Sequence, residues 1–206
     1  MSRSTKTSQI WSELADARAA RAGFERTRFS LDGEAFARDT EITPIVQMLF
    51  RRTNGLMRTE AYFGVSAEPF EQQWAERLRQ TSASITGGYP PLSLHAANVA
   101  SLRPRPWVDG APSDQDVANV ANWLDRAFEY AGRYPHSVGD LREQVEAGRI
   151  VDGKPDIYLM HPVKVRGFTG WLRETHGLDL GGRLHPFLED RTYPYDTEIM
   201  LAPGWR

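Results

Sequence analysis

Two pairs of apolar runs between residues 24 and 65 are each joined by a short turn signal. Residues 24–31 and 34–38 flank an Asp-Gly step, and residues 45–52 and 57–65 flank a segment that contains Asn54-Gly55. Asn and Gly accept the positive φ angles that tight hairpin turns require, so such steps between apolar runs are strong hairpin signals. The pattern therefore predicts two antiparallel hairpins and disfavours the crossover folds that bind nucleotides.

The two strands of the second hairpin have different patterns. Residues 45–50 are apolar at nearly every position, which is typical of a central strand that is covered on both sides. Residues 57–65 alternate instead, with Arg58, Glu60 and Tyr62 on one face and mostly apolar side chains on the other. We therefore expect the second strand to have a polar face along part of its length.

Apolar residues at helical spacing predict five helices. Ser113 and Asp116 form a Ser-x-x-Asp capping box in front of the most regular apolar stripe. Tryptophans occur within the stripes, which predicts that four of them are buried: Trp11, Trp74, Trp123 and Trp171. The predicted helices cover residues 10–22, 69–80, 113–131, 137–145 and 168–175.

These elements define an α+β fold class, with a mostly antiparallel twisted sheet of about four to six strands and helices packed on one face. Alternation over residues 95–102 predicts a further strand, and the Pro-rich residues 103–112 form the one plausible boundary between domains. We expect an α+β domain over residues 1–148. Residues 149–206 are predicted to be an irregular C-terminal extension that packs on the same domain.

Composition limits the class of protein further. The 206 residues, 40% of them hydrophobic, suffice for a large core, and the net charge of −2 gives no global attraction to nucleic acid or to an anionic membrane. The absence of cysteine excludes disulfides, thiolate metal sites and cysteine nucleophiles. The N-terminus lacks the apolar core of a secretory signal, and no run approaches the ~20 apolar residues of a membrane span. We therefore expect a soluble, cytoplasmic protein without a membrane partner.

Five short motifs occur in a characteristic order between residues 10 and 145. They are Gly23-Phe24 after the first helix, Phe36-Ala37-Arg38, Ile45-Val46-Gln47, Gly64-Val65 at a strand end, and Trp123 in a later helix. This order resembles an uncharacterised bacterial family, the forty-three-oh-four family of domains of unknown function. The resemblance implies an α+β fold and brings no established activity, so it assigns no catalytic residue. Small bacterial domains of this kind suggest an immunity or interaction role.

The histidines are the first place to look for catalysis. His161, His176 and His185 lie among acidic residues in the last third of the chain, and imidazole with carboxylate is a suitable ligand set for zinc or iron. Their spacing does not put two ligands on one face, and His161 and His185 each precede a proline, which favours turn backbone. We interpret them as loop histidines. With no nucleophile elbow and no phosphate-binding glycine loop, the sequence predicts no catalytic residue, no metal and no cofactor.

The strongest candidate for a recognition element is the Arg-Pro-Arg-Pro-Trp segment that contains Arg103, Arg105 and Trp107. Two guanidinium groups beside an indole, on a backbone stiffened by two prolines, can bind a carboxylate, a phosphate or a base. Arg51 and Arg52 extend this patch if the fold brings them close. The alternative interpretation is a solvated connection in which Trp107 plugs the edge of the core. A separate group, interpreted as a solvated helix and edge-strand face, comprises Arg18, Arg21, Arg26 and Arg28.

The sequence favours a non-enzymatic bacterial protein-binding module, of an immunity or accessory type, that recognises one protein partner. Tyr, Trp and Arg dominate interface hot spots, and Arg103, Arg105 and Trp107, together with Tyr193 and Tyr195 of the tail, fit such a surface. One alternative is a hydrolase or transferase that uses the C-terminal histidines and acidic residues, with or without a metal. Another is nucleic-acid binding through the Arg-Pro-Arg-Pro-Trp segment. The oligomeric state stays open.

Overall fold

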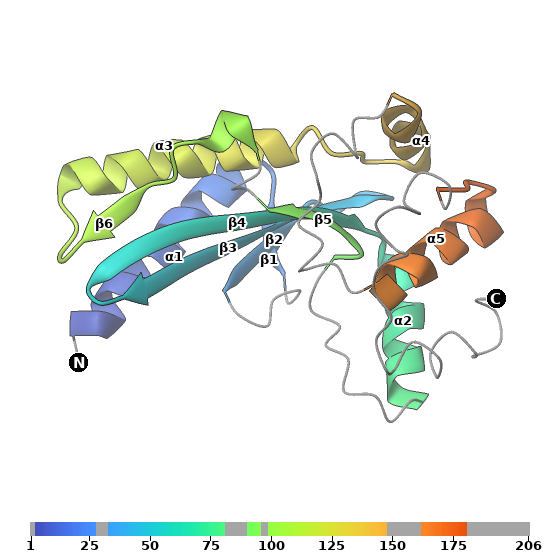
Figure 1. Ribbon diagram of the computed structural model, residues 1–206, viewed down its shortest axis with the longest axis horizontal. Helices are drawn as coiled ribbons and strands as arrows, with labels where there is room; N and C mark the ends of the chain where they lie inside the picture. The colour runs from blue at the N-terminus through green and yellow to red at the C-terminus, as the bar shows by residue number, and fades with distance from the viewer. Residues whose placement is uncertain (1–2, 28–32, 81–89, 96–98, 148–161, 181–206) are drawn as a thin grey trace.

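The computed structural model describes residues 3–27, 33–80, 90–95, 99–147 and 162–180. In chain order the described elements are α1 (Arg3–Arg21), β1 (Glu25–Thr27), β2 (Glu34–Ala37), β3 (Thr43–Thr53), β4 (Leu56–Ser66), α2 (Glu68–Gln80), β5 (Leu92–His95), the 3₁₀ turn η2 (Ala100–Leu102), β6 (Trp107–Asp109), α3 (Asp114–Ala131), α4 (Val138–Glu146) and α5 (Pro162–His176). The strands form one antiparallel sheet, which confirms the α+β class. In Figure 1, α1 and α3 lie across the sheet, while α2, α4 and α5 gather at the end away from the β3–β4 turn.

The β3–β4 hairpin is the longest part of the sheet. Its two strands of 11 residues each are joined by Asn54 and Gly55, whose φ angles are 51° and 86°. Positive φ at both turn positions is the geometry that Asn-Gly favours. This turn fixes the register, which places Arg51 opposite Arg58. The second predicted hairpin is thereby confirmed.

The first predicted hairpin is present as β1 and β2, which are shorter than the sequence suggested. Glu25 pairs with Ala37 in an antiparallel register. Asp32, the first residue of the predicted turn, lies outside the described residues. Since β1 has three residues and β2 four, this side of the sheet ends in short strands.

Two short strands share the other edge of β4. β5 pairs with residues 62–65 of β4, and β6 pairs with residues 56–58, so they lie one after the other along the same strand. The Pro-rich residues 103–112 were predicted as a possible domain boundary. They instead supply β6 to the sheet.

The predicted strand over residues 95–102 is wrong. β5 ends at His95, residues 96–98 lie outside the described part, and η2 follows as a tight turn. The backbone N–H of Leu102 donates to the Val99 carbonyl at 3.1 Å, and the turn buries Leu102 beneath α3. An alternating run of small apolar residues fits a strand and also fits a turn that buries one side chain, so the pattern alone does not distinguish them.

The first of two apolar clusters lies between the sheet and the helices α1 and α3. Phe36, Val46 and Phe63 come from the strands, and Trp11 and Trp123 come from the two helices. β3 is buried on both of its faces along residues 44–49, which confirms the prediction of a central strand.

The second cluster joins α2, α4 and α5. Phe70 and Trp74 of α2 meet Leu141 of α4 and Phe168 and Trp171 of α5. The ring centroids of Phe70 and Phe168 are 5.1 Å apart in an edge-to-face arrangement. The region predicted to be an irregular C-terminal extension therefore contributes a helix to the core. All four tryptophans that were predicted to be buried are at most 5% exposed.

The caps of α3 and α4 follow the sequence signals. The Ser113 side chain accepts from the Asp116 N–H at 3.2 Å, and the Asp116 carboxylate accepts from the Ser113 N–H at 2.9 Å. Ser137 caps α4 in the same manner by accepting from the Asp140 N–H. Hydrogen bonds from Ser113 hold the pKa of Asp116 below its ordinary value. Among the described helices, none combines the length and the apolar character needed to span a membrane.

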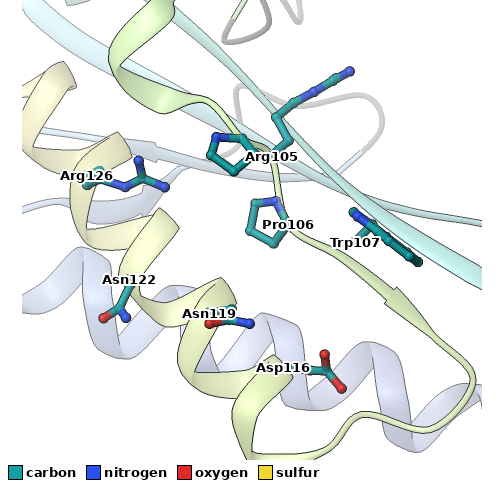
Figure 2. A pocket seen from close by; sticks show the side chains of 8 residues that line it. Arg105, Pro106, Trp107, Asp116, Asn119, Asn122 and Arg126 are labelled. Atoms are coloured by element: carbon teal, nitrogen blue, oxygen red, sulfur yellow. The ribbon is translucent and has the colours of Figure 1, made fainter.

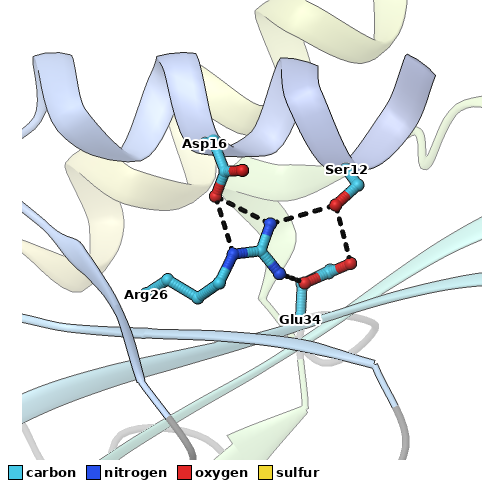
Figure 3. A network of polar contacts seen from close by, with 4 residues as sticks. All are labelled: Ser12, Asp16, Arg26 and Glu34. Carbon is cyan, nitrogen blue, oxygen red and sulfur yellow. Dashed lines mark hydrogen bonds and ion pairs between the residues drawn. The ribbon is translucent and has the colours of Figure 1, made fainter. Parts of the chain in front are cut away.

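A polar network fastens the edge strand β1 to α1 (Figure 3). The Arg26 guanidinium contacts Asp16 of α1 at 2.7 Å and forms an ion pair with Glu34 of β2, and it also donates to Ser12 at 3.0 Å. Arg18 of α1 is similarly paired with Asp125 of α3 at 2.8 Å. Arg18 and Arg26 were interpreted as parts of a solvated face. Arg26 is exposed on the edge strand, in agreement with that interpretation, and both side chains also make ion pairs that connect separate elements.

Candidate binding surface

The segment that contains Arg105 and Pro106 is anchored on both sides. On the β4 side, the carbonyl of Pro106 accepts from the Thr59 hydroxyl at 3.0 Å and from the Thr59 N–H at 3.4 Å. On the α3 side, Trp123 Nε1 donates to the Leu102 carbonyl at 3.1 Å, and Arg126 donates to the Ser101 carbonyl at 3.3 Å. These bonds fix the backbone at the points from which the candidate side chains project.

Trp107, the first residue of β6, is exposed. Its side chain is 65% accessible to solvent, and among the described residues Ile10, at 40%, is the other large apolar side chain classed as exposed. The neighbouring Val108 points into the core and is 2% exposed, because successive residues of a strand alternate between its faces. The alternative interpretation, in which Trp107 plugs the edge of the core, is therefore wrong.

The sheet register places two arginines in line with this indole. Trp107 of β6 lies opposite Arg58 of β4, and Arg58 lies opposite Arg51 of β3. Directly paired residues in antiparallel strands project from the same face, so the three side chains form a row across three strands. Arg51 and Arg58 are both exposed. The structure thus brings Arg51 into the same surface as the Arg-Pro-Arg-Pro-Trp segment.

A carboxylate, that of Glu60, lies beside this row. Its side chain is 22% exposed and lies two residues beyond Arg58 on the same face of β4. One carboxylate oxygen lies 3.4 Å from the Arg51 guanidinium and the other lies 3.8 Å from that of Arg105. We call the surface formed by Arg51, Arg58, Glu60, Arg105 and Trp107 the Trp107 face. It has three cations and one carboxylate.

A ridge formed by Arg105, Pro106 and Trp107 has a hollow on each side. The hollow towards the sheet, of about 350 Å³, also includes Arg58 and Leu56. The hollow towards α3 has a volume of about 460 Å³ and is shown in Figure 2. The α3 side chains that line it are polar: Asp116, Asn119, Asn122 and Arg126. They are spaced three, three and four residues apart, so they follow one stripe of the helix.

The remaining predicted site residues are placed differently. Arg52 lies beside Phe50 and Met57 on the opposite face of the hairpin and donates to the Gly110 carbonyl at 3.4 Å, so it does not belong to the Trp107 face. Arg103 precedes the ridge, and its carbonyl accepts from Arg126 at 3.5 Å. The predicted binding residues Tyr193 and Tyr195 lie outside the described residues.

Sequence reasoning missed Arg58 and Glu60 as site residues, although a signal was present. The Asn54-Gly55 turn has two residues, so counting outwards from it pairs residue 51 with residue 58. The pattern also placed Arg58 and Glu60 on the polar face of the strand. What the sequence did not contain was the position of β6, which places Trp107 next to that pair.

The residues considered for catalysis do not form a site within the described chain. The ring of His176 packs against Trp171 with centroids 4.9 Å apart, while His161 and His185 lie outside the described residues. Over the described ranges there is no group of three His, Asp or Glu side chains able to hold a metal ion. The hydrolase or transferase alternative therefore gains no supporting geometry from the described residues.

One buried ion pair does stand out. Lys164 of α5 and Glu71 of α2 are joined at 2.8 Å, with side chains 2% and 14% exposed, and Ser66 also bonds to Glu71. Burial raises the pKa of Glu71 and lowers the pKa of Lys164, while each partner opposes the effect on the other. Neither residue lines the hollows beside the ridge. The pair joins two helices of the second cluster, and we assign it a structural role.

Comparison of the chain with protein-family models, with curated proteins and with solved structures found no match in any of the three. The resemblance to the forty-three-oh-four family therefore stays a prediction.

Proposed function

We propose that the protein is a non-enzymatic protein-binding module and that the Trp107 face is its contact surface. The observation that carries this proposal is the 65% exposure of Trp107 on a strand whose other residues and preceding loop are anchored. An exposed indole on a rigid support offers a large contact area with little loss of conformational entropy on binding, and Trp and Arg are the residue types most enriched at interface hot spots.

The charges of the Trp107 face support an acidic partner. Three guanidinium groups surround one carboxylate, within a chain whose net charge is −2. A partner with carboxylates opposite Arg51, Arg58 and Arg105 gains charge-assisted hydrogen bonds, and arginine can form them in bidentate geometry. An accessory or immunity-type role, which small bacterial domains of this kind suggest, belongs to the same class of function.

The proposal is tested by purifying the tagged full chain from its native host and identifying what accompanies it by mass spectrometry. We expect one stoichiometric protein that survives nuclease and salt. Trp107→Ala should weaken its binding about 30-fold or more, equivalent to about 2 kcal/mol, because the central indole is removed. The stability of the variant should change by less than about 0.5 kcal/mol, since the side chain is exposed.

Ile10→Ala is the matched control because it removes, from α1, the other large apolar side chain that is exposed among the described residues. It should leave the partner bound. Equal retention of the partner by Trp107→Ala and the wild type would contradict the proposal, as would recovery of a metal or small molecule in place of a protein.

Nucleic-acid binding is a second candidate, favoured by the row of Trp107, Arg58 and Arg51. Bases stack on exposed aromatic rings, and arginines contact phosphates. Binding of this kind releases counterions and weakens steeply with salt. Titration of a fluorescent single-stranded oligonucleotide at 50 and about 200 mM salt tests it, and an affinity that falls more than about tenfold, and is lost in Trp107→Ala, would favour it over a protein partner.

A further inference from the structure

The two hollows beside the ridge differ in charge. On the sheet side, Arg58 and Arg105 line the hollow and Arg51 lies within the same row. On the α3 side, Arg105 of the shared ridge and Arg126 line the hollow together with the Asp116 carboxylate, whose pKa is held below its ordinary value by hydrogen bonds from Ser113. A ligand that crosses the ridge therefore meets arginines with no lining carboxylate in the sheet-side hollow, and arginines partly offset by Asp116 in the α3 hollow.

The α3 hollow carries the two amide side chains of Asn119 and Asn122 on the exposed side of α3. An amide side chain has a donor and an acceptor and so matches the N–H and C=O groups of an extended peptide backbone. Asn119 Oδ1 accepts from Gln115 at 3.0 Å, which holds that amide in place. The side-chain amide of Asn122 makes no hydrogen bond within the described part of the chain, so both its donor and its acceptor are available to a ligand.

We infer that the ridge and its two hollows bind a linear peptide segment with acidic side chains at one end and an apolar side chain in the middle. The carboxylates lie against Arg58 and Arg105, the apolar side chain packs on the Trp107 indole, and the backbone beyond it bonds to Asn122 and Asn119. This inference rests on the proposed function and adds the chemistry of the partner: a short acidic-apolar segment in place of a folded surface.

The same charge difference argues against a nucleic-acid strand as the occupant. A single strand carries a phosphate at every nucleotide and is held by basic groups along the whole groove. Asp116 would repel those phosphates in the α3 hollow, and Glu60 would repel them on the sheet side. A peptide can place its carboxylates at one end alone, against the arginines of the sheet-side hollow and away from Asp116.

The experiment selects phage-displayed random 12-residue peptides on the immobilised full chain and measures the affinities of the enriched sequences by fluorescence anisotropy. We expect Asp and Glu to be enriched on one side of an apolar residue. Arg58→Glu and Trp107→Ala should each weaken these peptides at least tenfold, and Asn122→Ala should weaken them about threefold. A peptide in which Lys replaces the acidic residues should bind Arg58→Glu better than it binds the wild type.

Arg142→Glu is the matched control, since Arg142 is an exposed arginine of α4 and lines neither hollow. The Arg142→Glu variant should bind the selected peptides with the same affinity as the wild type. The inference is overturned if no peptide is enriched, if the enriched peptides lack acidic residues, if Trp107→Ala and Arg58→Glu leave affinity unchanged, or if an oligonucleotide of twelve thymidines binds more tightly.

The two proposals fail in different ways. If Trp107→Ala loses the protein partner but no peptide is selected, the proposed function stands and the partner presents a folded surface. If Trp107→Ala retains the partner, the proposed function itself is wrong.

Discussion

Glu60 and Glu71 are two carboxylates in opposite surroundings. Glu71 lies between helices with one cation, Lys164, and the pair is buried. Glu60 lies on the sheet surface near three guanidinium groups, two of which it contacts. In the first region one cation balances one carboxylate and both are largely shielded from water, so the pair affects the stability of the fold. In the second region cations are in excess and exposed, so they are available to a ligand.

The largest expected effect comes from breaking the balanced pair. Lys164→Met leaves Glu71 buried without its cation, which should lower the free energy of unfolding at pH 7 by about 3–5 kcal/mol. The double variant Lys164→Met/Glu71→Gln should recover most of this loss, because no buried charge remains and Gln can still bond to Ser66. Urea denaturation measures both. A loss below about 1 kcal/mol in the single variant would show that solvent reaches Glu71.

The pH dependence of stability gives a second test of the buried environment of Glu71. The pKa of Glu71 is raised in the folded protein above its ordinary value of 4.5, because burial disfavours the carboxylate. A raised pKa means that the folded state binds the proton more tightly than the unfolded state does. The stability contributed by Glu71 is therefore complete below pH 4.5 and is lost as the pH rises through the raised pKa.

Urea denaturation of the wild type and Glu71→Gln from pH 4 to pH 7 tests this sign. The wild-type stability, relative to that of the variant, should decrease as the pH rises, while carboxylates elsewhere affect both proteins alike. A relative stability that increases over this range would mean that the attraction of Lys164 outweighs the burial of Glu71.

The smallest expected effect on stability is that of Glu60→Gln. Its ion pairs with Arg51 and Arg105 involve exposed arginines, and such pairs contribute about 0–1 kcal/mol. Removal of the carboxylate increases the excess of cations on the Trp107 face, so an acidic peptide or partner should bind a few-fold more tightly, measured at low salt. Weaker binding would indicate that Glu60 itself contacts the ligand or holds Arg105 in place.

The sequence predicted the parts of this molecule that local patterns determine. Asn54-Gly55 defined the turn and hence the register, Ser113 and Asp116 defined a helix start, and the tryptophan stripes defined buried faces. Each of these features depends on residues that are close in the chain. The local conformational preference of those residues is the same as the structure that they adopt in the fold.

The sequence did not predict contacts between distant segments. Lys164 and Glu71 are 93 residues apart and meet only because α2 and α5 pack together. Trp107 could have been buried or exposed, and the pairing of β6 with β4 decided the outcome. Residues 95–102 had the alternation of a strand, yet the position of η2 beneath α3 produced a tight turn.

The short outer strands have a consequence for self-association. Within the described chain, the two edges of the sheet consist of strands of three or four residues, whereas the 11-residue strands β3 and β4 lie inside. An edge of three residues offers few backbone groups to a second molecule, so it is a poor template for fibril growth. Aggregation through β4 would first require β5 or β6 to detach, and the bonds between Thr59 and Pro106 next to β6 oppose that step.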